Sequence, residues 1–259
     1  MSDQFPLPYS STDLTGQVAL VTGASSGLGA RFARVLAASG AKVAAAARRV
    51  DRLETLAKEI RSDGGECAAV ALDMTDSAQI VAAAEAAERE LGTVTILVNN
   101  AGIPDAQYAT KMSAELIDQV IDTNFRGPFV LSCEVARRLI AAKQPGRIVN
   151  ISSMGAFSYS GEGAALYSTT KAAIVRMTET MAVEWSRFNI NVNAIAPGAF
   201  ASEMMDGMLS RMGDITKFFP RQRMGDPALL DSTLLYLVAP ASEAVTGTVI
   251  KVDDGQGSR

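Results

Sequence analysis

The sequence predicts an α/β fold in which helices cover both faces of a doubly wound, seven-stranded parallel sheet. Short β-branched and apolar segments alternate with longer helical patterns over most of the 259 residues. Uninterrupted apolar strands are typical of a parallel sheet that is buried on both faces. A glycine-rich turn follows the first of them and opens a helix. Such alternation requires right-handed crossovers, and these produce a doubly wound sheet.

Seven segments have the length and apolar character of strands, beginning with QVALVT. In chain order they are 17–22, 42–46, 66–72, 96–99, 147–152, 191–195 and 248–252. Helical patterns lie between them, at 29–39, 52–62, 77–91, 114–142 and 167–188. The third of these helices is rich in Ala and Glu, which favour a helix.

The chain contains no linker rich in Pro, Gly or Ser and no internal repeat, so we expect one domain over residues 1–259. Residues 1–14 are expected to form an N-terminal arm. The interval 198–223 does not follow the alternation of strands and helices seen in the rest of the chain. Its four methionines (Met204, Met205, Met208 and Met212) and its paired Phe218 and Phe219 predict a mobile apolar flap over the substrate.

The composition excludes several classes of function. Hydrophobic residues make up 48% of the chain, enough for one sizeable core. A formal net charge of −4 argues against binding to nucleic acid or to an anionic membrane. The most apolar stretch, 35–47, is shorter than the roughly 20 residues that a membrane span needs. The N-terminus lacks a cationic start and an apolar run, so we expect no signal peptide and a cytoplasmic location.

The sequence contains no histidine. This absence excludes a Ser-His-Asp hydrolase and a Cys-His protease. The two cysteines, Cys67 and Cys133, lie in unrelated contexts and are interpreted as free thiols. Without histidine, and with two scattered cysteines, no metal site is predicted. Proton transfer must then use Tyr, Lys, Asp, Glu or water.

The turn at residues 22–29, TGASSGLG, has the features of a pyrophosphate-binding turn. Its glycines permit a tight turn, let the backbone approach a phosphate and allow the following helix to pack on the sheet. The helix N-terminus adds free N–H groups and the positive end of a dipole. The predicted cofactor contacts in this turn are Gly23, Ser25, Ser26, Gly27, Leu28 and Gly29.

Alanines at the end of the second strand, including Ala45, Ala46 and Ala47, are followed by Arg48 and Arg49. An acidic residue near this point often binds the ribose 2′-hydroxyl of NAD. Small neutral residues and guanidinium groups instead leave room and charge for a 2′-phosphate, which favours NADPH over NADH. The alternative is that both arginines are solvated charges at the start of a helix. The turn itself lacks a basic residue beside Ser25 and Ser26, so one common second contact to that phosphate is absent.

Tyr167 and Lys171 lie four residues apart in a helical pattern and therefore share a helix face. An ammonium group beside a phenol stabilises the phenolate and lowers a pKa that is ordinarily about 10. A tyrosine tuned in this way can exchange a proton with a carbonyl or an alcohol near neutral pH.

Taken together, the ordered motifs resemble those of the short-chain dehydrogenase/reductase family, in its single-domain branch, over about residues 15–255. Besides the glycine turn and the Tyr/Lys pair, the shared motifs are Asp73, the segment 99–102 (NNAG), Asn124, the segment 150–153 (NISS), and Pro197 with Gly198. The resemblance implies a Rossmann-like form of the predicted fold and an NAD(P)-dependent oxidoreductase that interconverts a ketone and a secondary alcohol.

The resemblance also implies a catalytic tetrad of Asn124, Ser153, Tyr167 and Lys171. Tyr167 would be the proton donor and acceptor, Ser153 would hold the substrate oxygen, Lys171 would bind the nicotinamide ribose, and Asn124 would position a water. Ser152 competes for the role of the serine, and alignment on Asn-Ile-x-Ser selects Ser153. The further implied cofactor contacts are Asp73, Met74, Asn100, Ala101, Gly102, Tyr167, Lys171, Pro197, Gly198 and Ser202, the last in place of the usual threonine.

For the substrate, the implied choices are a 3-oxoacyl thioester and a hydrophobic ketone. Apolar residues of the flap and a neighbouring loop favour such molecules, although they equally suit packing onto the core: Met154, Phe157, Tyr159, Met204, Met205, Phe218 and Phe219. The family resemblance further implies a homotetramer or homodimer. The alternatives are an NAD-linked secondary-alcohol dehydrogenase, a non-catalytic dinucleotide-sensing protein and a sugar-nucleotide epimerase or dehydratase.

Overall fold

A computed structural model of the chain describes residues 8–105, 107–158 and 163–257. Its centre is a parallel sheet of seven strands in the order β3-β2-β1-β4-β5-β6-β7. The strands are β1 (Val18–Thr22), β2 (Lys42–Ala47), β3 (Cys67–Ala71), β4 (Ile96–Asn99), β5 (Gly146–Ile151), β6 (Ile190–Pro197) and β7 (Val249–Val252). This topology confirms the predicted Rossmann-like, doubly wound α/β fold.

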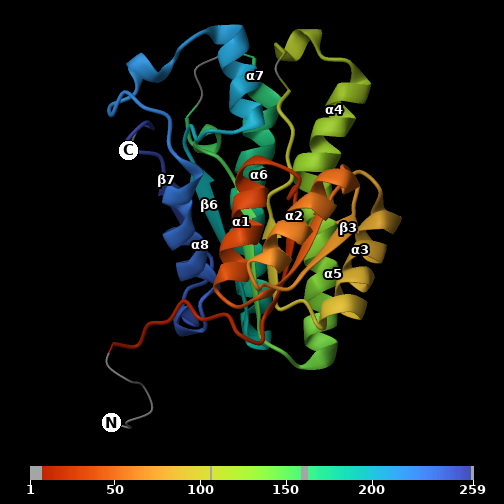
Figure 1. The fold of residues 1–259 in the computed structure, drawn as a ribbon. Helices are drawn as coiled ribbons and strands as arrows, with labels where there is room; N and C mark the ends of the chain where they lie inside the picture. The colour runs from red at the N-terminus through yellow and green to blue at the C-terminus, as the bar shows by residue number, and fades with distance from the viewer. Residues whose placement is uncertain (1–7, 106, 159–162, 258–259) are drawn as a thin grey trace.

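Helices cover both faces of the sheet (Figure 1). They are α1 (Gly27–Ala38), α2 (Val50–Ser62), α3 (Ser77–Leu91), α4 (Ala114–Ile121), α5 (Gly127–Ala142), α6 (Ala165–Trp185), α7 (Glu203–Met212) and α8 (Asp231–Val238). The described part of the chain contains no helix that combines the length and the apolar character needed to cross a membrane.

Two hydrophobic cores form because side chains alternate between the faces of a strand. In β1, Ala19 and Val21 pack into the core that α1, α2 and α8 cover, whereas Val18 and Leu20 pack into the core that α3, α5 and α6 cover. All five residues of β1 are buried. This burial on both faces explains why the strand is apolar without interruption.

The helical region predicted over 114–142 is helical throughout, but its α-helical geometry changes between α4 and α5. A π-helical turn of five residues, Asp122–Arg126, lies between them. Within this turn the Asn124 amide accepts from the Ile103 N–H (2.8 Å) and donates to the Ile103 carbonyl (2.9 Å). Those tertiary hydrogen bonds favour the wider turn, and π-turns occur frequently at functional sites.

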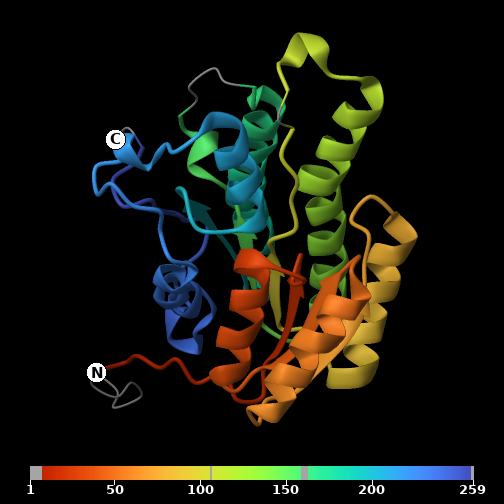
Figure 2. The same ribbon diagram turned by 45° about the horizontal axis from the view of Figure 1, so that its top comes forward.

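The interval 198–223 contains more regular structure than the sequence predicts. Ser202 caps α7, its hydroxyl accepting from the Met205 N–H at 3.3 Å, and a short 3₁₀ helix follows at Thr216–Phe218. Helix α8 was also not predicted, since eight residues are too few for a clear helical pattern. Figures 1 and 2 place α7 and α4 at the same end of the molecule, away from the N-terminal segment.

Candidate active site

The predicted site residues follow the carboxyl ends of several strands. Because all strands are parallel, these ends meet at one edge of the sheet, where open α/β sheets bind their ligands. The turn after β1 and the segment after β4 are joined directly there. The Thr22 hydroxyl accepts from the backbone N–H groups of Asn100 and Ala101, each at 3.0 Å, and the Asn100 amide donates to the Thr22 carbonyl at 2.9 Å.

The glycines of the turn are required by close backbone approach. A Cβ at Gly29 would lie 2.3 Å from the Gly23 carbonyl oxygen and 2.5 Å from the Asn100 amide nitrogen. Gly23 itself has a φ of +67°, in the left-handed region that glycine adopts most readily. Leu28 of the same turn packs against the core on the α1 side. The turn therefore holds the start of α1 against the sheet, as a phosphate-binding turn requires.

Tyr167 and Lys171 lie in the first turns of α6, and the Lys171 ammonium nitrogen is 5.7 Å from the centre of the Tyr167 ring. The same ammonium donates to the Ile151 carbonyl at 2.8 Å. A Cβ on Gly102 would lie 3.5 Å from both the Lys171 nitrogen and the Asn124 carboxamide oxygen. The structure thus brings Tyr167, Lys171 and Asn124 together beside the NNAG segment.

The two competing serines have different surroundings. Ser152 is buried, and its hydroxyl donates to the Lys171 carbonyl at 2.8 Å, which attaches β5 to α6. The Ser153 hydroxyl is hydrogen-bonded to the Tyr167 side chain and accepts from the Gly155 N–H at 3.0 Å. The position beside the tyrosine belongs to Ser153, in agreement with the alignment on Asn-Ile-x-Ser.

The pKa of Tyr167 is raised rather than lowered in this structure. Burial of the phenol is the main cause, the hydrogen bond with Ser153 lowers the pKa, and the charge of Asp105 raises it further. Burial also lowers the pKa of Lys171 to about 8. The lowering of the Tyr167 pKa that the sequence predicts is therefore not seen in this structure, because burial costs a phenolate part of its hydration.

Asp105 is a site residue that the sequence motifs did not indicate. It is 4% exposed, and its carboxylate accepts from the Tyr167 backbone N–H at 2.9 Å. The residue that precedes α6, Ala164, offers no side-chain cap. Asp105, which lies 62 residues before Tyr167, supplies the capping acceptor instead. No local pattern reveals a cap that comes from another loop.

The remaining predicted cofactor residues fall into two groups. Asp73 accepts from the Thr75 N–H (3.0 Å) and hydroxyl (2.9 Å), while Met74 is buried in the core on the α3 side. At the end of β6, buried Pro197 leads into Gly198, whose N–H donates to the Val252 carbonyl at 2.9 Å. Both groups follow the carboxyl ends of strands.

Ser202 lies against the phosphate turn, since a Cβ on Gly27 would be 3.4 Å from its Cβ. The start of α7 therefore adjoins the predicted pyrophosphate site.

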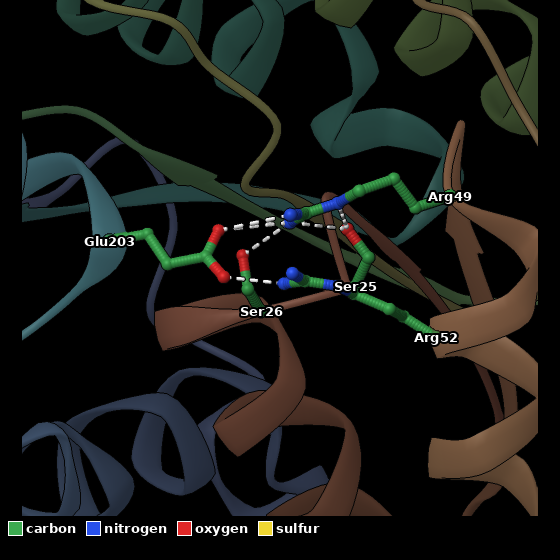
Figure 3. Close-up of polar contacts among 5 residues, drawn as sticks. All are labelled: Ser25, Ser26, Arg49, Arg52 and Glu203. Atoms are coloured by element: carbon green, nitrogen blue, oxygen red, sulfur yellow. Dashed lines mark hydrogen bonds and ion pairs between the residues drawn. The ribbon is translucent and has the colours of Figure 1, made fainter.

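The two arginines after β2 differ in their contacts. Arg48 is exposed. The Arg49 guanidinium donates to the hydroxyls of Ser25 and Ser26, at 3.1 and 2.8 Å, and to the Glu203 carboxylate at 3.1 Å (Figure 3). Arg52 of α2 also pairs with Glu203. The Glu203 carboxylate thus lies where two guanidinium groups converge beside two serine hydroxyls, and this arrangement also fits a phosphate group of a dinucleotide.

Comparison with known proteins agrees with this geometry. The model of the short chain dehydrogenase family matches residues 17–212. Gluconate 5-dehydrogenase of Gluconobacter oxydans is 34% identical over 245 residues, covering 93% of this chain and 95% of that protein. A 3-oxoacyl-[acyl-carrier-protein] reductase of Synechocystis is 35% identical over 246 residues, covering 94% and 98%.

A solved structure of actinorhodin polyketide ketoreductase with NADPH is also similar. It has a TM-score of 0.89 and 33% sequence identity, and the match covers 94% of this chain and 98% of that one. The family match spans most of the chain, and the similar proteins are oxidoreductases by name. This chain therefore belongs to the short-chain dehydrogenase family and is an NAD(P)-dependent oxidoreductase.

Proposed function

We propose that this protein reduces a ketone to a secondary alcohol with NADPH, and that its substrate is a 3-oxoacyl thioester or another hydrophobic ketone. The observation that carries the proposal is the partly buried Tyr167 phenol, hydrogen-bonded to Ser153 and lying beside the Lys171 ammonium. A raised phenol pKa keeps the proton on Tyr167 near neutral pH, which suits a proton donor and hence the direction of reduction.

In this mechanism Tyr167 gives its proton to the substrate oxygen, and Ser153 donates a hydrogen bond to the same oxygen. A nicotinamide dinucleotide held by the residues named below would supply the hydride to the carbonyl carbon. Lys171, with a pKa of about 8, carries its charge at neutral pH and stabilises the phenolate that forms. Its ammonium would also bind a ribose hydroxyl of the dinucleotide. Asn124 positions a water that returns a proton to Tyr167.

Ser202 and the turn residues would hold the dinucleotide, with Asp73 at the adenine. We assign the proposed preference for NADPH to Arg49. Its guanidinium already donates hydrogen bonds to the hydroxyls of Ser25 and Ser26 and to the Glu203 carboxylate. The guanidinium and the two serine hydroxyls can donate hydrogen bonds to a 2′-phosphate. Arg48 would add positive charge beside them.

Support for a hydrophobic substrate comes from apolar side chains at the site end of the sheet. Phe157, Met204 and Phe218 are 41%, 38% and 78% exposed, and they come from the loop after β5 and from the 198–223 interval. Tyr159, which the sequence also indicated, lies outside the described residues. Exposed apolar groups of this kind suit an acyl chain or a hydrophobic ketone.

A second candidate is a sugar-acid dehydrogenase, which the similarity to a gluconate 5-dehydrogenase favours. The intact arrangement of Tyr167, Ser153 and Lys171 argues against a non-catalytic dinucleotide sensor, because such a protein has no need to retain these groups.

The test is turnover of the purified protein with NADPH and with NADH, followed by nicotinamide absorbance. The panel contains a 3-oxoacyl thioester, a hydrophobic ketone and 5-ketogluconate. Preferential NADPH turnover on the first two is expected. Turnover on 5-ketogluconate alone would replace the proposal with the sugar-acid function. Tight cofactor binding with no turnover on any of the three would contradict the catalytic proposal.

We also propose a homotetramer or homodimer in the cytoplasm. Phe129 of α5 and Val183 of α6 are 44% and 78% exposed, on the two long helices where the family resemblance leads us to expect subunit contacts. Cys67 and Cys133 are both free, as in proteins of a reducing compartment. Light scattering of the purified chain tests the oligomeric state, and a monomeric mass would contradict it.

A further inference from the structure

Glu203, the first residue of α7, connects the 198–223 interval to the end of β2. Its carboxylate pairs with both Arg49 and Arg52, and Arg49 also binds the hydroxyls of Ser25 and Ser26 (Figure 3). The contacts join residues that lie 154 and 151 positions apart in the chain. Glu203 therefore lies across the side of the phosphate turn where the cofactor's adenosine ribose is expected.

The donor set around Glu203 is that of an anion site. Two guanidinium groups and two serine hydroxyls converge on or beside one carboxylate, and guanidinium groups bind carboxylates and phosphates through the same planar donors. The arginines hold the pKa of Glu203 at about 2, so that its carboxylate is ionised at any physiological pH. In this structure the anion that occupies the site is therefore the ionised Glu203 carboxylate of the protein itself.

The pair is held weakly enough to be displaced. The Glu203 side chain is 53% exposed, and those of Arg49 and Arg52 are 42% and 45% exposed. Exposed ion pairs contribute little to stability because water and salt screen them. A phosphomonoester carries up to two charges and three acceptor oxygens, so it is the stronger partner for the same donors. A neutral ribose hydroxyl has no charge with which to compete.

We propose that Glu203 is a specificity-determining residue that competes with the cofactor's 2′-phosphate for Arg49 and Arg52, and so lowers the affinity for NADP(H) without affecting NAD(H). This inference rests on the proposed function in taking Arg49 as the 2′-phosphate contact. Glu203 must leave the arginines before the phosphate binds. A variant without its charge is then expected to bind the phosphate more tightly.

The experiment compares 2′,5′-ADP, which carries the phosphate, with 5′-AMP, which lacks it, by calorimetry on the whole chain. Glu203→Gln should bind 2′,5′-ADP about five-fold more tightly than the wild type does, the size expected from the loss of two exposed ion pairs. Binding of 5′-AMP should stay within about two-fold. The matched control is Asp206→Asn, which removes one exposed charge from the same first turn of α7 and should leave both affinities unchanged.

Other outcomes would overturn the inference. Unchanged or weaker binding of 2′,5′-ADP to Glu203→Gln would mean that Glu203 does not compete, or that it orients the arginines for the ligand. Equal gains for both ligands would mean a general effect of α7 on the site. Failure of the proposed NADPH preference is a separate result, since it appears as weaker binding of 2′,5′-ADP than of 5′-AMP by the wild type. Circular dichroism of each variant confirms that it is folded.

Discussion

Burial determines the protonation of Tyr167 more than its neighbouring charges do. The phenol is partly buried, and this burial raises its pKa, while Ser153 lowers the pKa and the charge of Asp105 raises it. The same burial lowers the pKa of Lys171 to about 8. One physical cause therefore favours the neutral form of both groups. At neutral pH the result is a protonated phenol beside an ammonium that is still charged.

Removing the Tyr167 hydroxyl tests the proton donor. Tyr167→Phe keeps the ring and its packing but leaves the substrate oxygen without a proton. Turnover is expected to fall by about 10²- to 10⁴-fold, the usual contribution of general acid catalysis. Calorimetric affinity for the dinucleotide should stay close to the wild-type value. Near-normal turnover of this variant would rule out Tyr167 as the donor.

The pH dependence of reduction tests Lys171. We expect kcat/KM for the ketone to fall as the pH rises through about 8, because Lys171 then loses the charge that stabilises the phenolate. Its pKa is depressed from the ordinary 10.5, so the charge is lost at a lower pH than in an exposed lysine. The Tyr167 pKa is raised, so the phenol keeps its proton through this range.

The measurement is a kcat/KM profile from about pH 6 to about pH 10. Lys171→Arg is the comparison, since a guanidinium keeps its charge throughout and should abolish the fall near pH 8 even where the absolute rate is lower. A wild-type profile that is flat through pH 8 would contradict the assignment.

Among the elements, α6 and α7 carry the functional contacts that depend on distant parts of the chain. The N-terminus of α6 is capped by Asp105 from the loop after β4, and the start of α7 is attached to α2 through Glu203. The π-helical turn between α4 and α5 similarly depends on the Asn124 contact with Ile103. Each of these helices is a continuous segment of the sequence, but a side-chain contact with another segment stabilises one of its ends.

Asp105→Ala is expected to destabilise α6 at the turn that carries Tyr167. Loss of a capping acceptor typically lowers the free energy of unfolding by about 1 kcal/mol, and turnover should fall with it as Tyr167 shifts. Asp105→Asn keeps an acceptor oxygen for the Tyr167 N–H and removes the charge that raises the Tyr167 pKa. It should restore most of the stability.

The readouts for Asp105 are urea denaturation and the pH profile of turnover. The Asn variant should shift the ionisation of Tyr167 to lower pH, which a merely structural role would not do. If both variants lose stability equally, the capping contact is not the reason for the loss.

At the scale of the whole molecule, a buried polar network connects the layers. Asn150 of β5 accepts from the Asn99 amide (2.8 Å) and donates to the Thr178 hydroxyl (2.9 Å), and Asn99 also donates to Ser132 (2.9 Å). These bonds join β4 and β5 to α5 and α6 beneath the site. Asn150 is 0% exposed, so loss of its side chain would leave the buried Asn99 and Thr178 side chains without this hydrogen-bond partner.

Asn150→Ala is expected to lower the free energy of unfolding by about 2 to 4 kcal/mol, because it leaves buried polar groups unsatisfied and opens a small cavity. The control is Gln144→Ala in the exposed loop before β5, which should change stability by less than about 0.5 kcal/mol. Chemical denaturation of both variants measures the difference. Equal stabilities would show that the network does not hold the layers together.

Local sequence patterns predict the fold class, the order of the strands along the chain and the elements on which the motif residues lie. Strands that are apolar on both faces, a glycine turn after the first of them, and Tyr167 four residues before Lys171 are local patterns, and local periodicity decides which residues are buried. The choice of Ser153 over Ser152 rests on alignment to a local motif and stays a prediction; in the structure the Ser152 hydroxyl donates to the Lys171 carbonyl and the Ser153 hydroxyl accepts from the Gly155 N–H.

Four features depend on tertiary contacts: the direction of the Tyr167 pKa shift, the capping of α6 by Asp105, the π-helical turn between α4 and α5, and the pairing of Glu203 with Arg49 and Arg52. A pKa depends on how many groups from all elements withdraw a side chain from water, and an ion pair depends on where the fold brings two chain segments together. Neither quantity is encoded within a window of the sequence, because both are properties of the assembled layers.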